Sequence, residues 1–87
     1  MKTRQVSVGN THGLHARLAA QIVHVASRFT CSVSLAFKGR TANARNILAV
    51  MLLAASVGGT ISIEANGPDE AEAVEALSSL IGDRSDR

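Results

Sequence analysis

His15 and Arg17 are the two side chains in this sequence best suited to phosphate chemistry. They stand where a loop containing Gly13 gives way to a helical pattern. The first turn of a helix has unpaired N–H groups and partial positive charge, so it disfavours an imidazolium and favours an oxyanion. A neutral imidazole there can attack phosphorus, and Arg17 can bind phosphate through two parallel hydrogen bonds. On these residues alone, a surface histidine that merely caps a helix remains the favoured interpretation.

Other candidate sites carry weaker signals. His12 and His15 have the H-x-x-H spacing of a metal site, but no second cluster of ligands lies nearby in sequence and zinc prefers four, so we expect no metal. Cys31, at the start of an expected strand, is interpreted as a small filler rather than a reactive thiol. Phe29 and Phe37 are the only aromatic residues. They offer no stacking platform for single strands, so we expect no nucleic-acid partner.

Length and composition exclude several classes of protein. A chain of 87 residues with 46% apolar residues suits one small domain and argues against a large self-contained enzyme. A single cysteine excludes an intrachain disulfide framework. The sequence shows no charged-then-apolar leader and no apolar run near the ~20 residues that span a bilayer. We therefore expect a cytoplasmic protein that does not insert into a membrane.

The charges are divided unevenly along the chain. Residues 1–45 contain seven Lys or Arg, all three His and no acid, whereas residues 46–87 contain two Arg and all seven acids. The basic half could form a surface for an anion or an acidic partner. Alternatively, a two-layer fold could mix the halves in space, and the charge count favours neither reading.

Alternating apolar residues predict four strands. Three of them lie around residues 5–8, 32–37 and 61–65, and a return strand over 40–43 follows a tight Lys38-Gly39 turn in which Gly39 takes positive φ.

Helical spacing predicts three helices between these strands. The first runs from Ala16 to about Ser27, and the second covers about eight residues from an N-cap near Asn46. The third starts at Asp69 in a capping box with Glu72 and ends at Gly82. The order is β-α-β-β-α-β-α, which predicts an α+β fold with helices on one face of an antiparallel sheet. We expect residues 1–87 to form one domain, with 83–87 as a frayed tail.

The short second helix is apolar on every side. A helix this short turns only one side to the core, so its large apolar residues cannot all be buried and some must form an exposed patch. Such patches mark partner surfaces, and methionine adapts to several partners. The residues concerned are Ile47, Leu48, Met51 and Leu52.

The string Gly13-Leu14-His15-Ala16-Arg17, followed by Ala19 and Ala20, resembles the active-site signature of the HPr family. These are the histidine-containing phosphocarriers of the bacterial phosphoenolpyruvate-dependent phosphotransferase system. The similarity covers nearly the whole chain, including the strand spacing, the hairpin turn, the apolar helix after Asn46 and the segment 67–70. It implies an open-faced β-sandwich, in which three helices cover one face of a four-stranded antiparallel sheet.

The resemblance also implies roles for individual residues. His15 would accept a phosphoryl group on Nδ1 from Enzyme I and pass it to enzyme IIA domains during sugar uptake. Ala16, Arg17 and His12 would hold the phosphate. No cofactor is implied, and the protein would be a monomeric carrier rather than an enzyme. The residues implied to form the docking face are Arg17, Ala20, His24, Arg28, Ile47, Leu48, Met51 and Leu52.

Two residues depart from the family pattern. Leu18 stands where the family usually has proline, which restricts the first turn of a helix, so contact with partners or the His15 loop could differ. Asn46 stands where some relatives have a regulatory serine, so we expect no serine control. Three alternatives stay open: a carrier of the nitrogen-related regulatory branch, a non-phosphorylated interaction module, and a small RNA-binding α+β domain.

Overall fold

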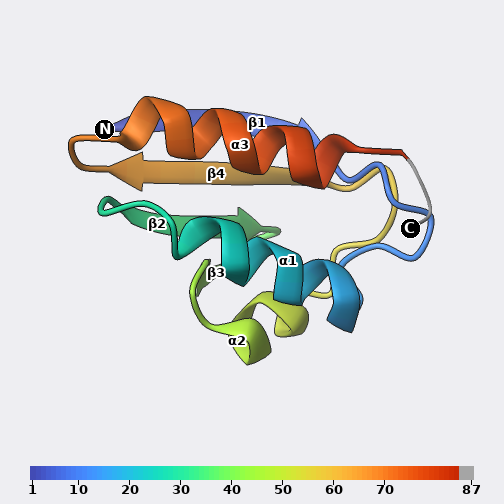
Figure 1. Cartoon of the computed structure of the whole chain (residues 1–87). Helices are drawn as coiled ribbons and strands as arrows, with labels where there is room; N and C mark the ends of the chain where they lie inside the picture. Colours follow the sequence, from blue (N-terminus) through green and yellow to red (C-terminus); the bar gives the residue numbers. More distant parts are fainter. Residues whose placement is uncertain (85–87) are drawn as a thin grey trace.

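The expected strands form one antiparallel sheet in the computed structural model, which describes residues 1–84. The strands are β1 (Lys2–Ser7), β2 (Ser32–Phe37), β3 (Arg40–Asn43) and β4 (Thr60–Asn66), in the spatial order β1-β4-β2-β3 (Figure 1). Every neighbouring pair is antiparallel. The predicted architecture is confirmed.

One face of the sheet is apolar and faces the helices. In the two central strands, Leu35 lies opposite Ile63 and Val33 opposite Ala65, and all four side chains are buried. The alternate residues are mainly polar and point to the opposite face, because successive side chains of a strand alternate in direction. Lys38 and Gly39 join β2 to β3 with φ values of 49° and 80°. Positive φ at both positions is typical of the tight turn whose twist matches a hairpin.

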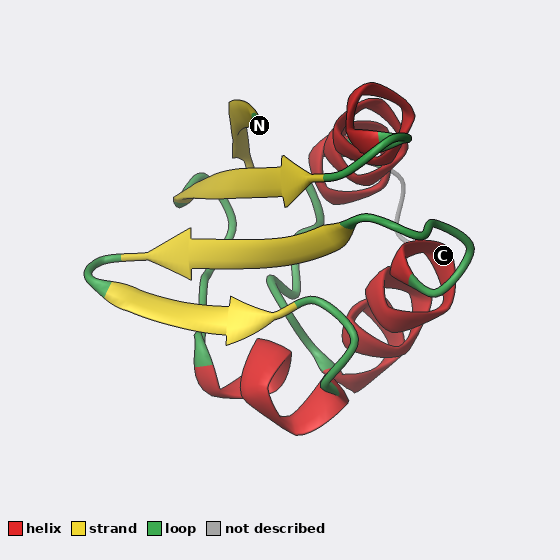
Figure 2. Cartoon of the chain, turned by 90° about the vertical axis from the view of Figure 1, so that its left-hand side faces the viewer, coloured by secondary structure: helices red, strands yellow, loops and turns green. Residues whose placement is uncertain are grey.

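The helices are α1 (Ala16–Ala26), α2 (Ile47–Leu52) and α3 (Glu70–Gly82). They occupy the same side of the sheet: in Figure 2 the strands are spread one above another, and the helices are gathered to their right and below. α3 packs against β1 and β4, while α1 packs between α2 and α3. α3 ends at Gly82 as predicted. The buried residues of α1 are Leu18, Ala19, Ile22 and Ala26, and those of α3 are Ala73, Val74, Leu77 and Ile81.

The predicted capping box at the start of α3 is wrong. Asp69 is the N-cap residue, but its side chain makes no cap hydrogen bond. Instead its carboxylate accepts from the backbone N–H groups of Thr30 and Cys31, both at 2.9 Å. Two amides from a distant segment satisfy the carboxylate better than one local amide, and they tie the start of α3 to the start of β2. The bond from the Thr30 amide is the main cause that holds the pKa of Asp69 below its usual value.

Glu70, rather than Glu72, closes the turn before α3. Its Oε1 accepts from the Gly67 N–H at 3.1 Å, and its Oε2 lies 2.9 Å from the amino group of Met1. The Gly67 amide first, and the amino terminus second, lower the pKa of this carboxyl group. The first strand and the last helix are thereby joined at their ends.

Smaller expectations have mixed outcomes. Asn46 caps α2 by accepting from the Ala49 N–H at 3.0 Å, but α2 has six residues rather than eight. Cys31 is buried, and burial raises the pKa of its thiol, which agrees with a filler rather than a reactive thiol. Asp83 is the C-cap residue of α3. Residues 85–87 of the expected frayed tail lie outside the described part of the chain, so fraying of 83–87 stays a prediction. No helix within residues 1–84 is long and apolar enough to cross a bilayer.

Candidate active site

His15 is the N-cap residue of α1, and its ring is oriented by the helix itself. The backbone is extended there (φ −79°, ψ 173°), and Nδ1 accepts a hydrogen bond from the Arg17 N–H at 3.2 Å. A nitrogen that accepts a hydrogen bond carries a lone pair, so we assign the proton of the neutral ring to Nε2. The nucleophilic lone pair therefore belongs to Nδ1 and points toward the first turn of α1.

The other ring nitrogen is shielded. Nε2 of His15 is buried from solvent and has no hydrogen-bond partner among residues 1–84. An unpaired buried N–H is costly, and most buried polar groups in folded proteins have a partner. The two nitrogens are therefore not equivalent, and only Nδ1 lies beside donors that can hold an oxyanion.

The loop before His15 is built from backbone and amide contacts. The Asn10 side chain is buried, and its Oδ1 accepts from the His12 N–H at 2.8 Å, while its backbone oxygen accepts from the Gly13 N–H at 3.0 Å. The Leu14 N–H donates to the Ala55 oxygen at 2.9 Å. Gly13 has φ +66°, and a Cβ there would lie 2.5 Å from that same oxygen. Only glycine fits this position.

Sequence reasoning missed the role of Asn10 and Leu14 in this loop. Neither residue is among the candidate site residues that the sequence indicates. A signal was present, because asparagine often bonds the backbone two residues ahead in a turn. Leu14 is 6% exposed, and its contact with Ala55 comes from a segment 41 positions away in sequence, which no local pattern reveals.

Ala16 and Arg17 lie where the sequence predicted, in the first turn of α1. Both are exposed, and the Arg17 guanidinium has no ion pair or hydrogen bond within the described residues. The first turn of α1 therefore places a backbone N–H beside Nδ1 of His15 and carries, in Arg17, a guanidinium without a partner among the described residues. Both favour a negatively charged group there.

His12 is brought against His15. The two ring centroids lie 5.7 Å apart, with the rings nearly perpendicular at 89°. His12 is exposed, and the Asn10 carboxamide holds its backbone in place. No group of three or more His, Cys, Asp or Glu side chains within residues 1–84 is arranged to hold a metal ion.

Ala20 and His24 lie on the exposed side of α1, farther along the helix. His24 is nine residues from His15, which corresponds to about 13 Å along the axis, so it does not reach the His15 ring. Its Nε2 lies 3.4 Å from a guanidinium nitrogen of Arg28. Ala20 and His24 line a shallow hollow of about 500 Å³, together with neighbours on α1 and Leu80 of α3. Its lining is Arg17, Ala20, Gln21, His24, Val25 and Leu80.

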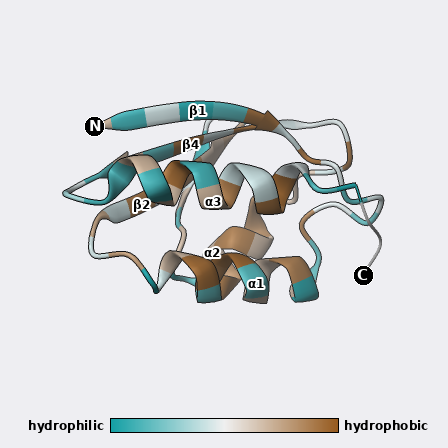
Figure 3. Cartoon of the chain, turned by 45° about the horizontal axis from the view of Figure 1, so that its top comes forward, coloured by the Kyte–Doolittle hydropathy of each residue, from teal (hydrophilic) through white to brown (hydrophobic). Residues whose placement is uncertain are grey.

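The large apolar residues of α2 form an exposed patch, as predicted. Val50 and Leu53 fill the core, whereas the outward residues stay in solvent, and Figure 3 shows the hydrophobic colouring of this helix beside α1. We call the exposed set the α2 patch. Its members are Ile47 (43% exposed), Leu48 (63%), Met51 (37%) and Leu52 (64%).

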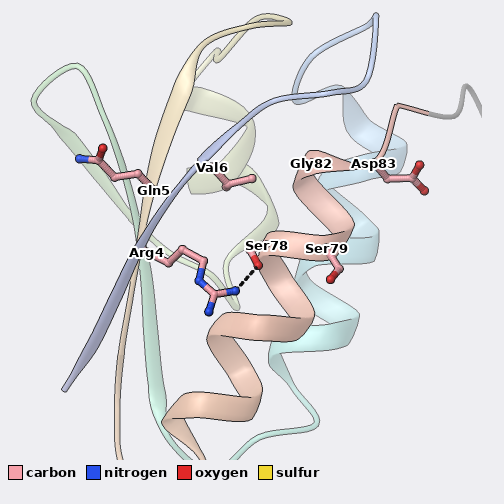
Figure 4. A pocket seen from close by; sticks show the side chains of 7 residues that line it. All are labelled: Arg4, Gln5, Val6, Ser78, Ser79, Gly82 and Asp83. Atoms are coloured by element: carbon pink, nitrogen blue, oxygen red, sulfur yellow. Dashed lines mark hydrogen bonds between the residues drawn. The ribbon is translucent and has the colours of Figure 1, made fainter.

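A second hollow lies between β1 and α3 and contains none of the candidate residues (Figure 4). Arg4 is the only cation among the described residues that line it, and its Nη1 lies 2.6 Å from Oε2 of Glu75 and 3.1 Å from Oγ of Ser78. Because this guanidinium is already paired, the hollow does not offer a free positive charge to an anion.

Comparison with known proteins agrees with this arrangement. A family model described as the PTS HPr component phosphorylation site matches residues 2–83. The phosphocarrier protein HPr of Cupriavidus necator is 42% identical over 84 residues, which make up 97% of this chain and 94% of that protein. The HPr-like protein Crh of Halalkalibacterium halodurans is 42% identical over 81 residues, 93% of this chain and 96% of that protein.

Solved structures show the same fold. The phosphocarrier protein HPr from Bacillus anthracis superposes with a TM-score of 0.88 at 38% identity, covering 92% of this chain and 95% of that one. An HPr dimer from Thermoanaerobacter tengcongensis gives a TM-score of 0.73 at 38% identity, with 93% of each chain covered. With a family model spanning nearly all of its length and relatives above 40% identity, this chain belongs to the HPr family of phosphocarriers of the phosphotransferase system.

Proposed function

We propose that this protein accepts a phosphoryl group on Nδ1 of His15 from phosphorylated Enzyme I and passes it to enzyme IIA domains. The observation that carries the proposal is the hydrogen bond from the Arg17 N–H to Nδ1. Because Nδ1 accepts this bond, it carries the lone pair of the neutral ring, which supports Nδ1 as the nucleophile at the positive end of α1.

The transfer needs only one bond to form and one to break. The lone pair of Nδ1 attacks phosphorus, the bond from phosphorus to the donor breaks, and its electron pair leaves with the donor atom. The proton on Nε2 stays in place, so the ring can later leave as a neutral imidazole when the next acceptor attacks. Alignment and charge neutralisation supply most of the catalysis in such a transfer.

Ala16, Arg17 and His12 hold the transferred group in this proposal. Once phosphorus occupies Nδ1, the Arg17 N–H is released to a phosphoryl oxygen, and the Ala16 N–H lies in the same turn. The unpaired Arg17 guanidinium adds a charge-assisted bond. The His12 ring lies close enough to contribute.

Partners dock on the exposed side of α1 and on the α2 patch. α1 and α2 pack directly against each other, so Arg17, Ala20 and His24 form one continuous surface with the patch. Positive charge on α1 attracts acidic partners, and apolar side chains supply the buried area.

The remaining parts of the proposal concern the state of the protein. We propose that residues 1–87 form one domain that works in the cytoplasm as a monomeric carrier, without a cofactor or a catalytic activity of its own. Some structural relatives are dimers, so light scattering at working concentration tests the monomer. Asn46 uses its side chain as a helix cap and offers no hydroxyl for serine control.

The first candidate function is phosphoryl transfer in the sugar-uptake branch of the phosphotransferase system, and the second is a regulatory role. The second candidate is supported by the similarity to an HPr-like protein named Crh, which another relative's name describes as a catabolite repression HPr. A regulatory carrier of the nitrogen-related branch belongs to the same candidate. Purified enzyme IIA domains from each branch distinguish the two, because only the cognate domain receives the phosphoryl group rapidly.

Mass spectrometry tests the proposal directly. Incubation with phosphoenolpyruvate and Enzyme I should add a single acid-labile phosphoryl group to the wild type and none to His15→Ala. Gln5→Ala serves as the matched control, because Gln5 lies in β1 and pairs with Ser62 of β4, and it should still be phosphorylated. A folded wild type that gains no phosphoryl group would leave a non-phosphorylated interaction module as the function.

A further inference from the structure

The shallow hollow that Ala20 and His24 line lies between α1 and α3, and we call it the α1–α3 hollow. α1 packs against both other helices and lies between them (Figure 1). Val25 of α1 and Leu80 of α3 contribute apolar side chains to the hollow, and both also pack against the core. Ala20 contributes only a methyl group, which leaves room above these two side chains. Apolar surface from two helices therefore meets at one open place, on the side of α1 that faces α3.

Positive charge borders the α1–α3 hollow, and no acid is among the described residues that line it. Arg17 lines it in the first turn of α1, and His24 lines it seven residues later, about 10 Å along the helix axis. Nε2 of His24 lies 3.4 Å from a guanidinium nitrogen of Arg28, so Arg28 lies beside this second end. Neither arginine has a carboxylate partner within residues 1–84. The hollow therefore combines an apolar floor with an unpaired guanidinium near each end.

The shape of the α1–α3 hollow decides which kind of occupant it suits. A small-molecule site buries most of its ligand in a cleft or cavity, whereas this hollow is shallow and lies open on the outside of two helices. A protein partner can cover it from above and bury a side chain in it. Large apolar side chains seated in such hollows anchor protein interfaces, and charges around them attract a partner of opposite sign. An acidic partner with an apolar anchor therefore fits this surface.

We propose that the α1–α3 hollow takes a large apolar side chain of an acidic phosphoryl-transfer partner, with a carboxylate of that partner bound to Arg28. The inference rests on the proposed function and extends its docking face. Ala20 and His24 already belong to that face, whereas Leu80 adds a third helix to it. Because α1 lies between α2 and α3, the α2 patch and the hollow flank α1 on two sides. A partner that covers the exposed side of α1 therefore contacts both.

Two substitutions make the floor of the hollow polar without filling it. Leu80→Gln and Val25→Thr replace apolar side chains by polar ones of similar size. Both positions are only partly buried, so both variants should fold, which circular dichroism checks. Val6→Thr is the matched control, because Val6 is also partly buried against the core but lies in β1, outside the hollow. Steady-state kinetics of phosphorylation by Enzyme I and of transfer to enzyme IIA domains are measured for each variant.

We expect each hollow variant to lose about tenfold in kcat/KM in at least one of the two steps, because the anchor would bury a polar group that has no partner. The loss should appear as a higher KM at an unchanged kcat, and Val6→Thr should match wild type in both steps. The proposal is overturned if neither folded hollow variant transfers more slowly than Val6→Thr in either step, and Val25→Thr decides alone if Leu80→Gln is unstable. Failure of the proposed function is distinct, since wild type would then gain no phosphoryl group.

Discussion

Replacing Leu48 by alanine should weaken partner docking without unfolding the protein. Leu48 is 63% exposed, and burial of a whole leucine side chain contributes about 1.5–3 kcal/mol. The exposed share therefore corresponds to about 1–2 kcal/mol when a partner covers it. This amounts to a loss of about five- to thirtyfold in kcat/KM for phosphoryl transfer from Enzyme I. The unfolding free energy should change by less than about 0.5 kcal/mol, as for most surface substitutions.

Val50 provides the matched comparison on the same helix. It is fully buried at 0% exposure, and Val50→Ala removes apolar volume and leaves a cavity. The expected cost is about 2 kcal/mol of unfolding free energy, which lowers the Tm by on the order of 10 °C in a domain of this size. Transfer kinetics below the melting range should stay near those of wild type.

Transfer reactions that are quenched at successive times measure the rate of phosphoryl transfer from Enzyme I. Thermal unfolding followed by circular dichroism measures the stability of each variant. The expected pattern is a loss of transfer in Leu48→Ala and a loss of stability in Val50→Ala. The reasoning is refuted if Leu48→Ala unfolds as readily as Val50→Ala, because Leu48 would then belong to the core. It is equally refuted if Leu48→Ala transfers phosphate at the wild-type rate, since the α2 patch would then have no part in docking.

Three further substitutions test the parts of the fold that hold the site. Gly13→Ala would place a Cβ 2.5 Å from the Ala55 oxygen, at a residue whose φ is +66°. The backbone conformation alone costs an alanine about 1–2 kcal/mol, so both the Tm and the rate of His15 phosphorylation should fall. Leu18→Ala removes a core side chain that is 3% exposed and should lower the unfolding free energy measured in urea by about 2–5 kcal/mol. A urea midpoint equal to that of wild type would show that other residues anchor the first turn of α1. The pKa of Asp69 is lowered in the folded state. The ionised carboxylate therefore stabilises the fold at pH values above the pKa of an unfolded aspartate, and this stabilisation is lost as the pH falls through the lowered pKa of the folded state. Asp69→Asn should therefore be less stable than wild type at neutral pH and lose less stability on acidification, and parallel pH profiles of the two proteins would contradict this.

Elements whose formation depends on local periodicity were predictable from the sequence. β3 and the end of α3 lie at the predicted residues, because a tight turn and a glycine mark them locally. The capping box failed because Asp69 bonds to amides 38 and 39 positions away, and only the packed fold brings these groups together. The hydrogen bonds of Asn10 are local, to the backbone of His12 and Gly13, so its turn was predictable from the sequence, whereas the contact of Leu14 with Ala55 was not.

The uneven charge of the chain now has a structural explanation. Of the basic residues in the first half, Arg4 pairs with a carboxylate of α3, so the fold does mix the two halves at that point. Arg45 donates to two backbone carbonyls ahead of β2, and Arg40 donates to one in α2. These three arginines stabilise the fold. Arg17 and Arg28, at the two ends of α1, have no carboxylate partner within residues 1–84. Lys2 and Lys38 also lack a carboxylate partner within residues 1–84, but they belong to β1 and to the hairpin turn after β2. The unpaired positive charge on the helix that His15 caps therefore comes from Arg17, with Arg28 just beyond the other end of α1.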